Sequence, residues 1–340
     1  MSLVDGLIDR GALPDALVRF GIRRLLRQRL RDEAAREHPQ RHLLELRSSP
    51  LAVETDAANR QHYEVPPRFF ECVLGPRLKY SSCYYPTGAE SLAQAEELML
   101  ALSAERAQLE DGQDVLELGC GWGSLTLWIA ERYPASRIVA LSNSAPQRRF
   151  IEERARERGL ANVEVITADI NRFRTDRSFD RIVSVEMFEH VRNHALLFER
   201  VAGWLRPKGR AFVHVFCHTR YTYPFEIDGD NDWMGRHFFT GGLMPSEQLF
   251  LGYDEHLVAE QHWRVSGSHY ARTSEHWLAN QDSHREELLE ILRGVHGEDA
   301  ARWFERWRVF FMSCAELFGY HGGDEWRVAH YLFRHRDRPS

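Results

Sequence analysis

Short apolar runs alternate with amphipathic stretches through the middle of the chain. The apolar runs predict five strands, at Asp114–Leu118, Arg137–Leu141, Val163–Ile166, Asp180–Val185 and Ala211–Phe216. Helical periodicity fills the intervals at Ser124–Tyr133, Pro146–Gly159 and Ala195–Leu205, and Pro207–Gly209 is expected to form a turn. Strands that alternate with helices in this way predict an open, mostly parallel α/β sheet.

The segments on either side of this alternation are mainly helical in pattern. Helices are predicted at Leu3–Leu46, Ser91–Leu109, Ser274–Leu292 and Ala300–Leu317, and two further strands at Leu257–Val265 and Trp326–Arg334. We therefore predict four parts: an N-terminal helical cap (1–105), an α/β core (106–220), a helical insertion (221–325) with a core strand near 257–265, and a closing strand with a tail (326–340).

The first helical stretch is basic. Its arginines between apolar positions are Arg23, Arg24, Arg27, Arg29 and Arg31. The simplest interpretation is a helix packed on the body of the protein with a solvated basic face. A lid, a helix for a partner or a contact with an anionic surface is the alternative.

Composition excludes several classes of protein. The 340 residues include 44 basic and 50 acidic side chains, and the net charge of −6 argues against a nucleic-acid binder. No run of about 18 apolar residues exists and the N-terminus lacks the apolar region of a secretory signal, so we expect no membrane insertion. The cysteines form no CxxC pair, so we expect reduced thiols in a cytoplasmic protein and no metal site.

A glycine-rich turn follows the first predicted strand. Its spacing is E-x-G-x-G-x-G, formed by Glu117, Gly119, Gly121 and Gly123. A dinucleotide fingerprint has G-x-G-x-x-G, so the third glycine comes one residue early, and a carboxylate lies on the strand itself. A carboxylate is of no use to a pyrophosphate but can accept from an ammonium group or balance a sulfonium. The pattern therefore favours S-adenosylmethionine over a nicotinamide cofactor.

Polar residues follow the next strands at the same edge of the sheet, where such sheets bind ligands. Asn143 ends the second strand in place of the usual ribose-binding acid, with Gln147 one helical turn further on. After the third strand, Asp169 suits the adenine amino group and Ile170 can pack on the ring. Val185 ends the fourth strand. Each residue alone could be an ordinary loop residue, but together they indicate one ligand site.

Seven motifs carry a family resemblance that runs from about Tyr63 to Arg334. They are Leu78–Ser81, Val115–Gly123, Glu186–Val191, Phe238–Gly242, His269–Thr273, Ala315–Tyr320 and Glu325–His330. With them the chain resembles class I, Rossmann-like, S-adenosylmethionine-dependent methyltransferases of the cyclopropane-fatty-acid-synthase superfamily. It is most similar to the coclaurine N-methyltransferase group of plants, which methylates amines. The resemblance implies that Tyr80 and Ser81 touch the cofactor from the cap, and that the enzyme could be a homodimer.

The chain departs from the lipid cyclopropane synthases at informative positions. By the resemblance, the base site of those enzymes, which holds a bicarbonate-like ion, corresponds to Ser82, Glu189, His214 and Tyr270, with Ser82 replacing a cysteine. Glu186 stands where they carry a glycine, a pattern seen in the amine N-methyltransferases. Cys314 aligns with a cysteine of the lipid synthases, but packing is the simpler role for it.

The segment after the fourth strand carries candidate acid/base residues. If Glu186, Glu189 and His190 open a helix, their i, i+3 and i+4 spacing puts them on one face. An alkylamine must lose its proton before it can be methylated. We predict that Glu189 and His190 form the acid/base pair and that Glu186 binds the amine. A structural bridge between core and cap is the alternative role for Glu189 and His190.

Two more residues complete the predicted substrate pocket. His214 and Tyr270 are expected beside the amine, and Phe238 is one of the aromatic residues expected to wall an apolar pocket for an aromatic or heterocyclic amine.

Three other functions are weighed against amine N-methylation. Methyl or methylene transfer to an unsaturated acyl lipid is the main alternative, and Glu186 and Ser82 argue against it. Nucleic-acid base methylases carry a segment like N/D-P-P-Y after the fourth strand, which Val185–Phe188 lacks. A cofactor-binding module without catalysis would leave Glu189 and His190 without a function.

Overall fold

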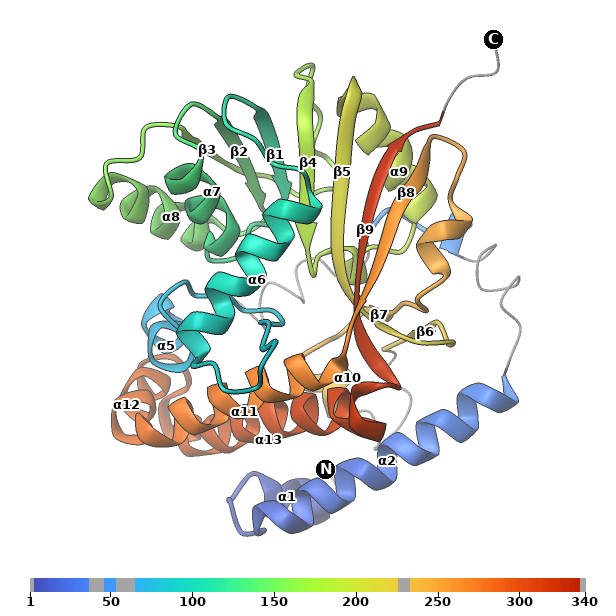
Figure 1. The fold of residues 1–340 in the computed structure, drawn as a ribbon. Helices are drawn as coiled ribbons and strands as arrows, with labels where there is room; N and C mark the ends of the chain where they lie inside the picture. The colour runs from blue at the N-terminus through green and yellow to red at the C-terminus, as the bar shows by residue number, and fades with distance from the viewer. Residues whose placement is uncertain (1–2, 37–45, 53–64, 226–232, 337–340) are drawn as a thin grey trace.

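The computed structural model describes residues 3–36, 46–52, 65–225 and 233–336. Its centre is a seven-stranded sheet in the order β3-β2-β1-β4-β5-β9-β8 (Figure 1). The strands are β1 (Asp114–Leu118), β2 (Arg137–Ser142), β3 (Val163–Thr167), β4 (Phe179–Val185), β5 (Leu205–His218), β8 (Leu257–Val265) and β9 (Trp326–His335). β1 to β5 pair in parallel, and β9 pairs antiparallel with both β5 and β8. The predicted α/β sheet is confirmed.

Helices cover both faces of the sheet, which explains why its strands are apolar runs rather than alternating patterns. Val115 of β1 packs with α6 (Leu92–Arg106) and α7 (Ser124–Arg132). Its neighbour Leu116 faces the other way and shares a core with α9 (His194–Trp204). α8 (Ala145–Glu157) follows β2 and packs against β3.

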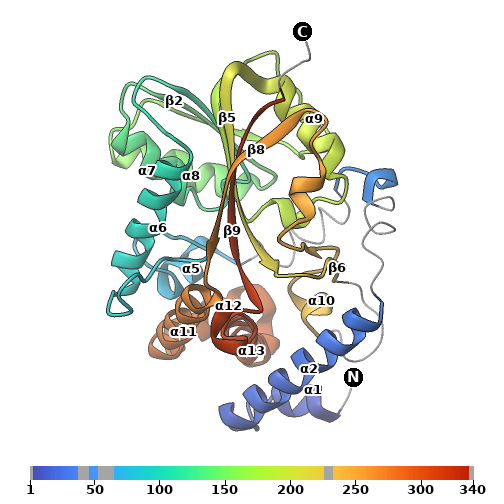
Figure 2. The ribbon, with the colours of Figure 1, turned by 45° about the vertical axis from the view of Figure 1, so that its right-hand side comes forward.

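A helical layer lies below the carboxyl ends of the parallel strands (Figures 1 and 2). It comprises α5 (Pro67–Val73), α11 (Gly267–Ser283), α12 (Arg285–His296) and α13 (Ala300–Phe318). Fully buried aromatic side chains such as Phe69, Trp277 and Trp307 form its core. This layer, from the N-terminal part and the insertion, therefore faces the edge of the sheet where ligands bind.

Two N-terminal helices, α1 (Leu3–Ile8) and α2 (Asp15–Ala35), pack on the outside of α13 (Figure 2). Arg19 of α2 pairs with Glu275 at 2.5 Å and with Glu316 at 3.2 Å, and Arg23 pairs with Glu316 at 2.9 Å. These ion pairs support a helix packed on the body of the protein. No helix in the described part of the chain is long and apolar enough to cross a membrane.

The remaining described elements are short and lie mainly in the loop-rich connections. They are β6 (Tyr223–Pro224), β7 (Leu243–Met244), α10 (Trp233–His237), and the 3₁₀ turns η1 (Phe188–His190), η2 (Leu249–Gly252), η3 (Gly297–Asp299) and η4 (Tyr320–Gly323). The end of the predicted first helical stretch (37–45), the residue Tyr63 and the last four residues of the tail lie outside the described residues. The four-part division of the chain stays a prediction.

The structure corrects three predicted elements. Over residues 3–36, the first helical stretch is two helices, α1 and α2, because residues 9–14 between them are not helical. Pro207–Gly209 is not a turn but part of β5, because Leu205 already pairs with Phe179 and the strand absorbs a register shift before Arg210. The predicted helix Ser274–Leu292 is two helices, because the backbone of His284 leaves the helical conformation (φ −106°, ψ 26°) between α11 and α12.

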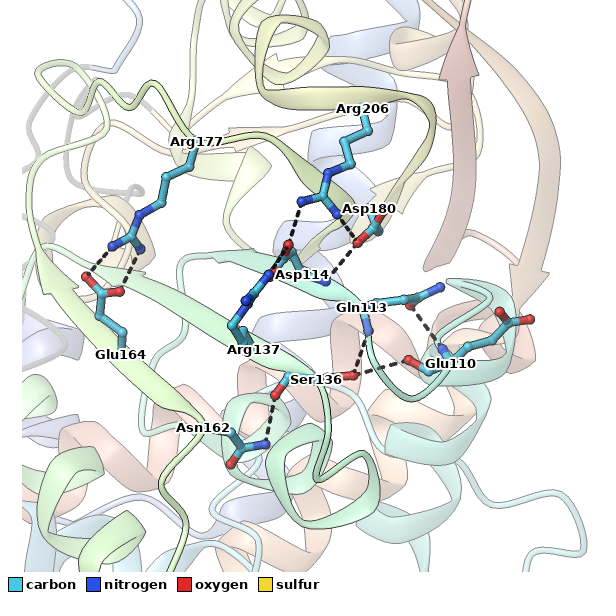
Figure 3. A network of polar contacts seen from close by, with 10 residues as sticks. All are labelled: Glu110, Gln113, Asp114, Ser136, Arg137, Asn162, Glu164, Arg177, Asp180 and Arg206. Carbon is cyan, nitrogen blue, oxygen red and sulfur yellow. Dashed lines mark hydrogen bonds and ion pairs between the residues drawn. The ribbon is translucent and has the colours of Figure 1, made fainter.

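The starts of the parallel strands are joined by a polar network (Figure 3). Arg206 at the start of β5 bridges Asp114 of β1, at 2.5 Å, and Asp180 of β4. Arg137 of β2 also pairs with Asp114, at 2.5 Å. Charged groups at this edge therefore neutralise one another, whereas the opposite edge of the sheet opens into cavities.

Candidate active site

The glycine-rich turn between β1 and α7 is built for close approach to its backbone. Gly119, Gly121 and Gly123 have φ values of 80°, 51° and 80°, a region that glycine adopts without strain. A Cβ on Gly119 would lie 2.6 Å from the Cγ of Met187. A Cβ on Gly121 would meet nothing within 4 Å, so the turn leaves open space beside its peptide groups.

Two adjoining cavities lie along this turn. They share Gly119, Gly121 and Glu186. The larger cavity is also lined by Asn143, Gln147, Asp169, Ile170 and His190, and the smaller one by Tyr80, Ser81, Glu117 and Val185. The structure thus brings together the residues predicted to hold the cofactor, except Gly123, which caps α7 and packs against Ile151.

The smaller cavity contains a buried acid on β1. Glu117 is 2 % exposed, and the Thr126 hydroxyl donates to its Oε2. Burial raises the pKa of Glu117 to about 7, and the hydrogen bond from Thr126 opposes this. A buried carboxyl group that faces a cavity costs stability, and a cationic ligand would compensate that cost.

The larger cavity contains polar groups suited to a nucleoside. Gln147 accepts a hydrogen bond from the Ser142 hydroxyl at 2.6 Å, and its buried Nε2 donates to no described residue. Asp169 accepts from the backbone N–H and the side-chain amide of Asn171, at 2.7 and 2.9 Å. The side chain of Asn143 is exposed at the rim. An unfilled buried donor and an oriented carboxylate are hydrogen-bonding groups available to a ligand.

Glu186 lies where the two cavities meet. Its φ of 49° is left-handed, a conformation that costs a residue other than glycine about 1–3 kcal/mol. Its N–H donates to the carbonyl of His214 on the neighbouring strand at 2.8 Å. Strain of this kind persists where the surroundings hold the residue in place, and it concentrates at functional sites.

Three donors converge on the Glu186 carboxylate. Oε1 accepts from the Ser82 N–H at 3.0 Å and from Nε2 of His214 at 3.2 Å. Oε2 accepts from the Tyr270 hydroxyl at 2.7 Å. Burial raises the pKa of Glu186, whereas the buried Lys79 ammonium and the hydrogen bonds from Ser82 and Tyr270 favour the charged form.

Glu189 and His190 occupy different environments. The predicted helix face does not form, because Glu186 precedes a single 3₁₀ turn, Phe188–His190, rather than opening a helix. His190 lines the larger cavity and packs at 4.8 Å against the ring of Phe239. Burial lowers the pKa of His190 to about 4, so the ring is neutral at physiological pH.

Glu189 is fully buried and lines neither cavity. Its Oε1 accepts from the Phe216 N–H at 2.7 Å, while Oε2 has no hydrogen-bond donor among the described residues. Burial, followed by the charge of Glu186, raises its pKa well above the usual range. Its predicted role in acid/base catalysis stays a prediction.

None of the other predicted substrate residues His214, Tyr270 and Phe238 lines either cavity, but two of them contact Glu186. His214 and Tyr270 contact Glu186 directly, and the Tyr270 ring stacks on Phe318 at 4.2 Å. Phe238 is fully buried, stacks on Phe310 at 4.5 Å and lines neither cavity. Cys314 on α13 is half-buried, and burial raises the pKa of its thiol.

Several contributors to the site were not singled out from the sequence. Lys79 is buried, and its ammonium donates to the Ser82 carbonyl at 2.8 Å and to the Ser81 hydroxyl. The sequence did set Lys79 apart, because Lys79 and Lys208 are the only lysines in the chain. Met187 packs under Gly119; it lies within the motif Glu186–Val191, but the sequence analysis gave it no role of its own. No group of side chains able to hold a metal ion occurs within the described ranges.

Comparisons with known proteins agree with this geometry. The family model for mycolic acid cyclopropane synthetase matches residues 52–326. The (S)-coclaurine N-methyltransferase of Thalictrum flavum subsp. glaucum is 40% identical over 294 residues, which cover 85% of this chain and 81% of that protein. The cyclopropane-fatty-acyl-phospholipid synthase of Escherichia coli (strain K12) is 30% identical over 272 residues, 76% of this chain and 68% of that protein.

A solved structure gives the same result in three dimensions. A coclaurine N-methyltransferase bound to N-methylheliamine and SAH matches with a TM-score of 0.93 and 35% identity, over 97% of this chain and 98% of that one. SAH is the product that S-adenosylmethionine leaves after methyl transfer.

The residues of the two cavities fit S-adenosylmethionine. Glu117 is a buried acid that would face its cationic end, the open side of Gly121 would admit it to the backbone, and Asp169 and Gln147 would hydrogen-bond its nucleoside. The chain therefore belongs to the mycolic acid cyclopropane synthetase family, alongside the coclaurine-type N-methyltransferases, and is an S-adenosylmethionine-dependent methyltransferase.

Proposed function

We propose that this enzyme methylates the nitrogen of a small aromatic or heterocyclic amine. One observation carries the proposal: the Glu186 carboxylate lies where the two cavities that fit the cofactor meet, and it therefore borders the cofactor site. An anion there attracts an ammonium group, a charge that an acyl chain does not carry.

The hydrogen bonds of Glu186 leave room for one more donor. A carboxylate has about four lone-pair positions. Those of Oε1 are taken by Ser82 and His214, and Tyr270 takes one on Oε2. The remaining position on Oε2 is available to an amine N–H, and such a charge-assisted hydrogen bond would fix the nitrogen in the cavity.

The resemblance to the lipid synthases suggests where the carboxylate of Glu186 comes from in evolutionary terms: it occupies the place of their bound anion. Of the four positions that correspond to their bicarbonate-like base site, Ser82, His214 and Tyr270 all donate to Glu186 in this chain. We propose that the Glu186 side chain supplies from within the protein the carboxylate that those enzymes take from solution.

Bound S-adenosylmethionine supplies an electrophilic methyl carbon on a sulfonium. The protein places the amine in line with that carbon and removes its proton. The N–C bond forms as the C–S bond breaks, the electron pair of the broken bond stays on sulfur, and the proton passes to the protein. Glu186 holds the nitrogen, and the neutral ring of His190 in the same cavity can accept the proton.

The proposal keeps the predicted pair of Glu189 and His190, but it gives Glu189 a supporting role and His190 the contact with the substrate. The Glu189 carboxyl group is fully buried and accepts a hydrogen bond from the N–H of Phe216 on β5. It would support the position of His190 without touching the substrate.

The test offers labelled S-adenosylmethionine with a panel of aromatic and heterocyclic amines and, separately, with vesicles of unsaturated phospholipid. We expect label in one or more amines and none in lipid, and Glu186→Gln should weaken amine binding while cofactor binding, measured by calorimetry, stays near normal. Label found in lipid alone would overturn the proposal in favour of acyl-chain modification.

A chemical rescue sharpens this test. Glu186→Gly removes the carboxylate but leaves its three donors in place, so added formate or bicarbonate should restore part of the lost activity. Acetamide of similar size serves as the control, because it has no negative charge and should restore none.

We further propose that the enzyme is a homodimer, as the family resemblance implies, and that it lies in the cytoplasm, as its unpaired cysteine pattern suggests. Light scattering coupled to gel filtration measures the mass of the assembly, and a mass of one chain would refute the homodimer. Fractionation of the source cells identifies the compartment.

A further inference from the structure

A continuous line of hydrogen bonds leads from the far end of α6 to Glu186. Nη1 of Arg106 lies 2.8 Å from Nδ1 of His330, and Nε2 of His330 lies 3.0 Å from Nδ1 of His214. Nε2 of His214 lies 3.2 Å from Oε1 of Glu186. The sheet sets this line, because His214 of β5 and His330 of β9 are direct cross-strand partners.

The line has only one consistent direction. A guanidinium group donates and never accepts, so Nδ1 of His330 must be the acceptor. In a neutral imidazole the other nitrogen then carries the hydrogen, so Nε2 of His330 donates to Nδ1 of His214. By the same rule, Nε2–H of His214 donates to Glu186.

Both rings are neutral in this environment. His214 and His330 are fully buried, and burial lowers the pKa of each well below the usual range; the cations Lys79 and Arg106 act in the same direction. Without Arg106, the pair could also adopt the reverse tautomers. Nε2 of His214 would then be an acceptor, and Glu186 would have to be protonated to remain bonded to it.

We propose that Arg106 and His330 are positioning residues for methyl transfer, which fix the tautomer of His214 and so keep Glu186 an anionic acceptor for the amine. This inference rests on the proposed function of Glu186. Neither residue lines a cavity at the site, so both act through His214.

Other charged and titratable groups also face Glu186. Lys79 precedes the loop that presents the Ser82 N–H, Tyr270 approaches from α11, and His190 and Glu189 follow in the chain. All of these remain in place when Arg106 is changed. A shift of the tautomer after that change is therefore attributable to the line of hydrogen bonds.

The first experiment needs no substrate. Long-range ¹⁵N–¹H spectra of the ¹⁵N-histidine-labelled enzyme report which ring nitrogen carries the hydrogen, and His214→Gln and His330→Gln assign the two signals. We expect both rings to carry it on Nε2, and His214 to shift towards the Nδ1–H form in Arg106→Met. A wild-type His214 that carries its hydrogen on Nδ1 overturns the inference, even if amine methylation is established.

The second experiment separates positioning from folding. Arg106→Met keeps an apolar side chain against the ring of Trp263, over which Arg106 lies at 5.0 Å. We expect the KM for the amine to rise about tenfold, as for the loss of one hydrogen bond, with cofactor affinity unchanged. Arg181→Met is the matched control, because Arg181 is also half-buried but bonds only backbone carbonyls.

Substitutions at His330 complete the design. Glutamine has one acceptor and one donor and can preserve the direction of the line, whereas leucine cannot. We expect His330→Gln to keep most of the amine affinity and His330→Leu to lose it. The two variants are compared only if their melting temperatures are equal, so that a difference in affinity does not reflect a difference in folding. If both folded variants bind the amine equally well, or if Arg181→Met raises the KM as much as Arg106→Met, the inference is wrong.

Discussion

The hydroxyl of Tyr270 offers the sharpest test of Glu186 as the anion of the active site. Tyr270→Phe removes the donor to Oε2 at 2.7 Å but keeps the ring stacked at 4.2 Å on Phe318. A hydrogen bond to a charged group contributes about 1.5–3 kcal/mol, which corresponds to about 10- to 150-fold in a rate constant. We expect kcat/KM for the amine to fall by that factor.

The pH dependence should move in a defined direction. The hydrogen bond from Tyr270 favours the charged form of Glu186, so its removal raises a pKa that burial has already raised. Activity that needs the carboxylate is present above that pKa and is lost as the pH falls through it. The acidic limb of the kcat/KM profile should therefore shift to higher pH in Tyr270→Phe, by about one unit or more.

The assay measures initial rates of methyl transfer between pH 5 and pH 9. Tyr253→Phe is the control, because Tyr253 is also buried but packs with Phe198 and Phe250, away from the cavities. A Tyr270→Phe enzyme with kcat/KM within twofold of the wild type and an unmoved acidic limb would refute the assignment of Glu186.

Three further changes test other parts of the site. Gly119→Ala should lower the free energy of unfolding by about 1–3 kcal/mol in urea titrations and weaken cofactor binding, because its Cβ would meet Met187 at a φ of 80°. The pKa of Glu117 is about 7 when folded and near 4.5 when unfolded, so the ligand-free enzyme should lose about 3 kcal/mol of stability as the pH rises through that interval. Glu117→Gln should abolish this loss, seen by unfolding at pH 5 and pH 8, while S-adenosylmethionine binds more weakly in calorimetry. Glu189→Gln should keep most of the single-turnover rate, because glutamine imitates the protonated acid that burial favours and still accepts from Phe216, whereas Glu189→Ala should lose most of it.

The local sequence was sufficient to predict the core of the fold and the edge of the sheet that holds the cofactor. Apolar runs of four to six residues located β1 to β4 within one residue, because the inner strands β1, β2 and β4 are largely buried on both faces and the edge strand β3 keeps its apolar residues inward. The rule that ligands bind where parallel strands end then placed Asn143, Asp169 and Glu186 along one cavity.

The features that the sequence did not reveal depend on contacts between distant segments. Arg106 and His330 are separated by 224 residues and meet only because β9 returns beside β5. A histidine within the apolar middle of β9, Val328–Phe333, was the available signal. The supposed helix at Glu186–His190 failed because a short polar segment after a strand does not define its own conformation, and the positive φ of Glu186 follows from its tertiary contacts.

The left-handed backbone at Glu186 bears on how related enzymes could exchange one chemistry for another. Its φ of 49° is a conformation that glycine adopts freely, and glycine is the residue that the resemblance places there in the lipid synthases. A single substitution at this position would add or remove an internal carboxylate while the main chain keeps its course. The same fold can therefore accommodate either an anion bound from solution or the carboxylate of its own side chain, with no change in the backbone.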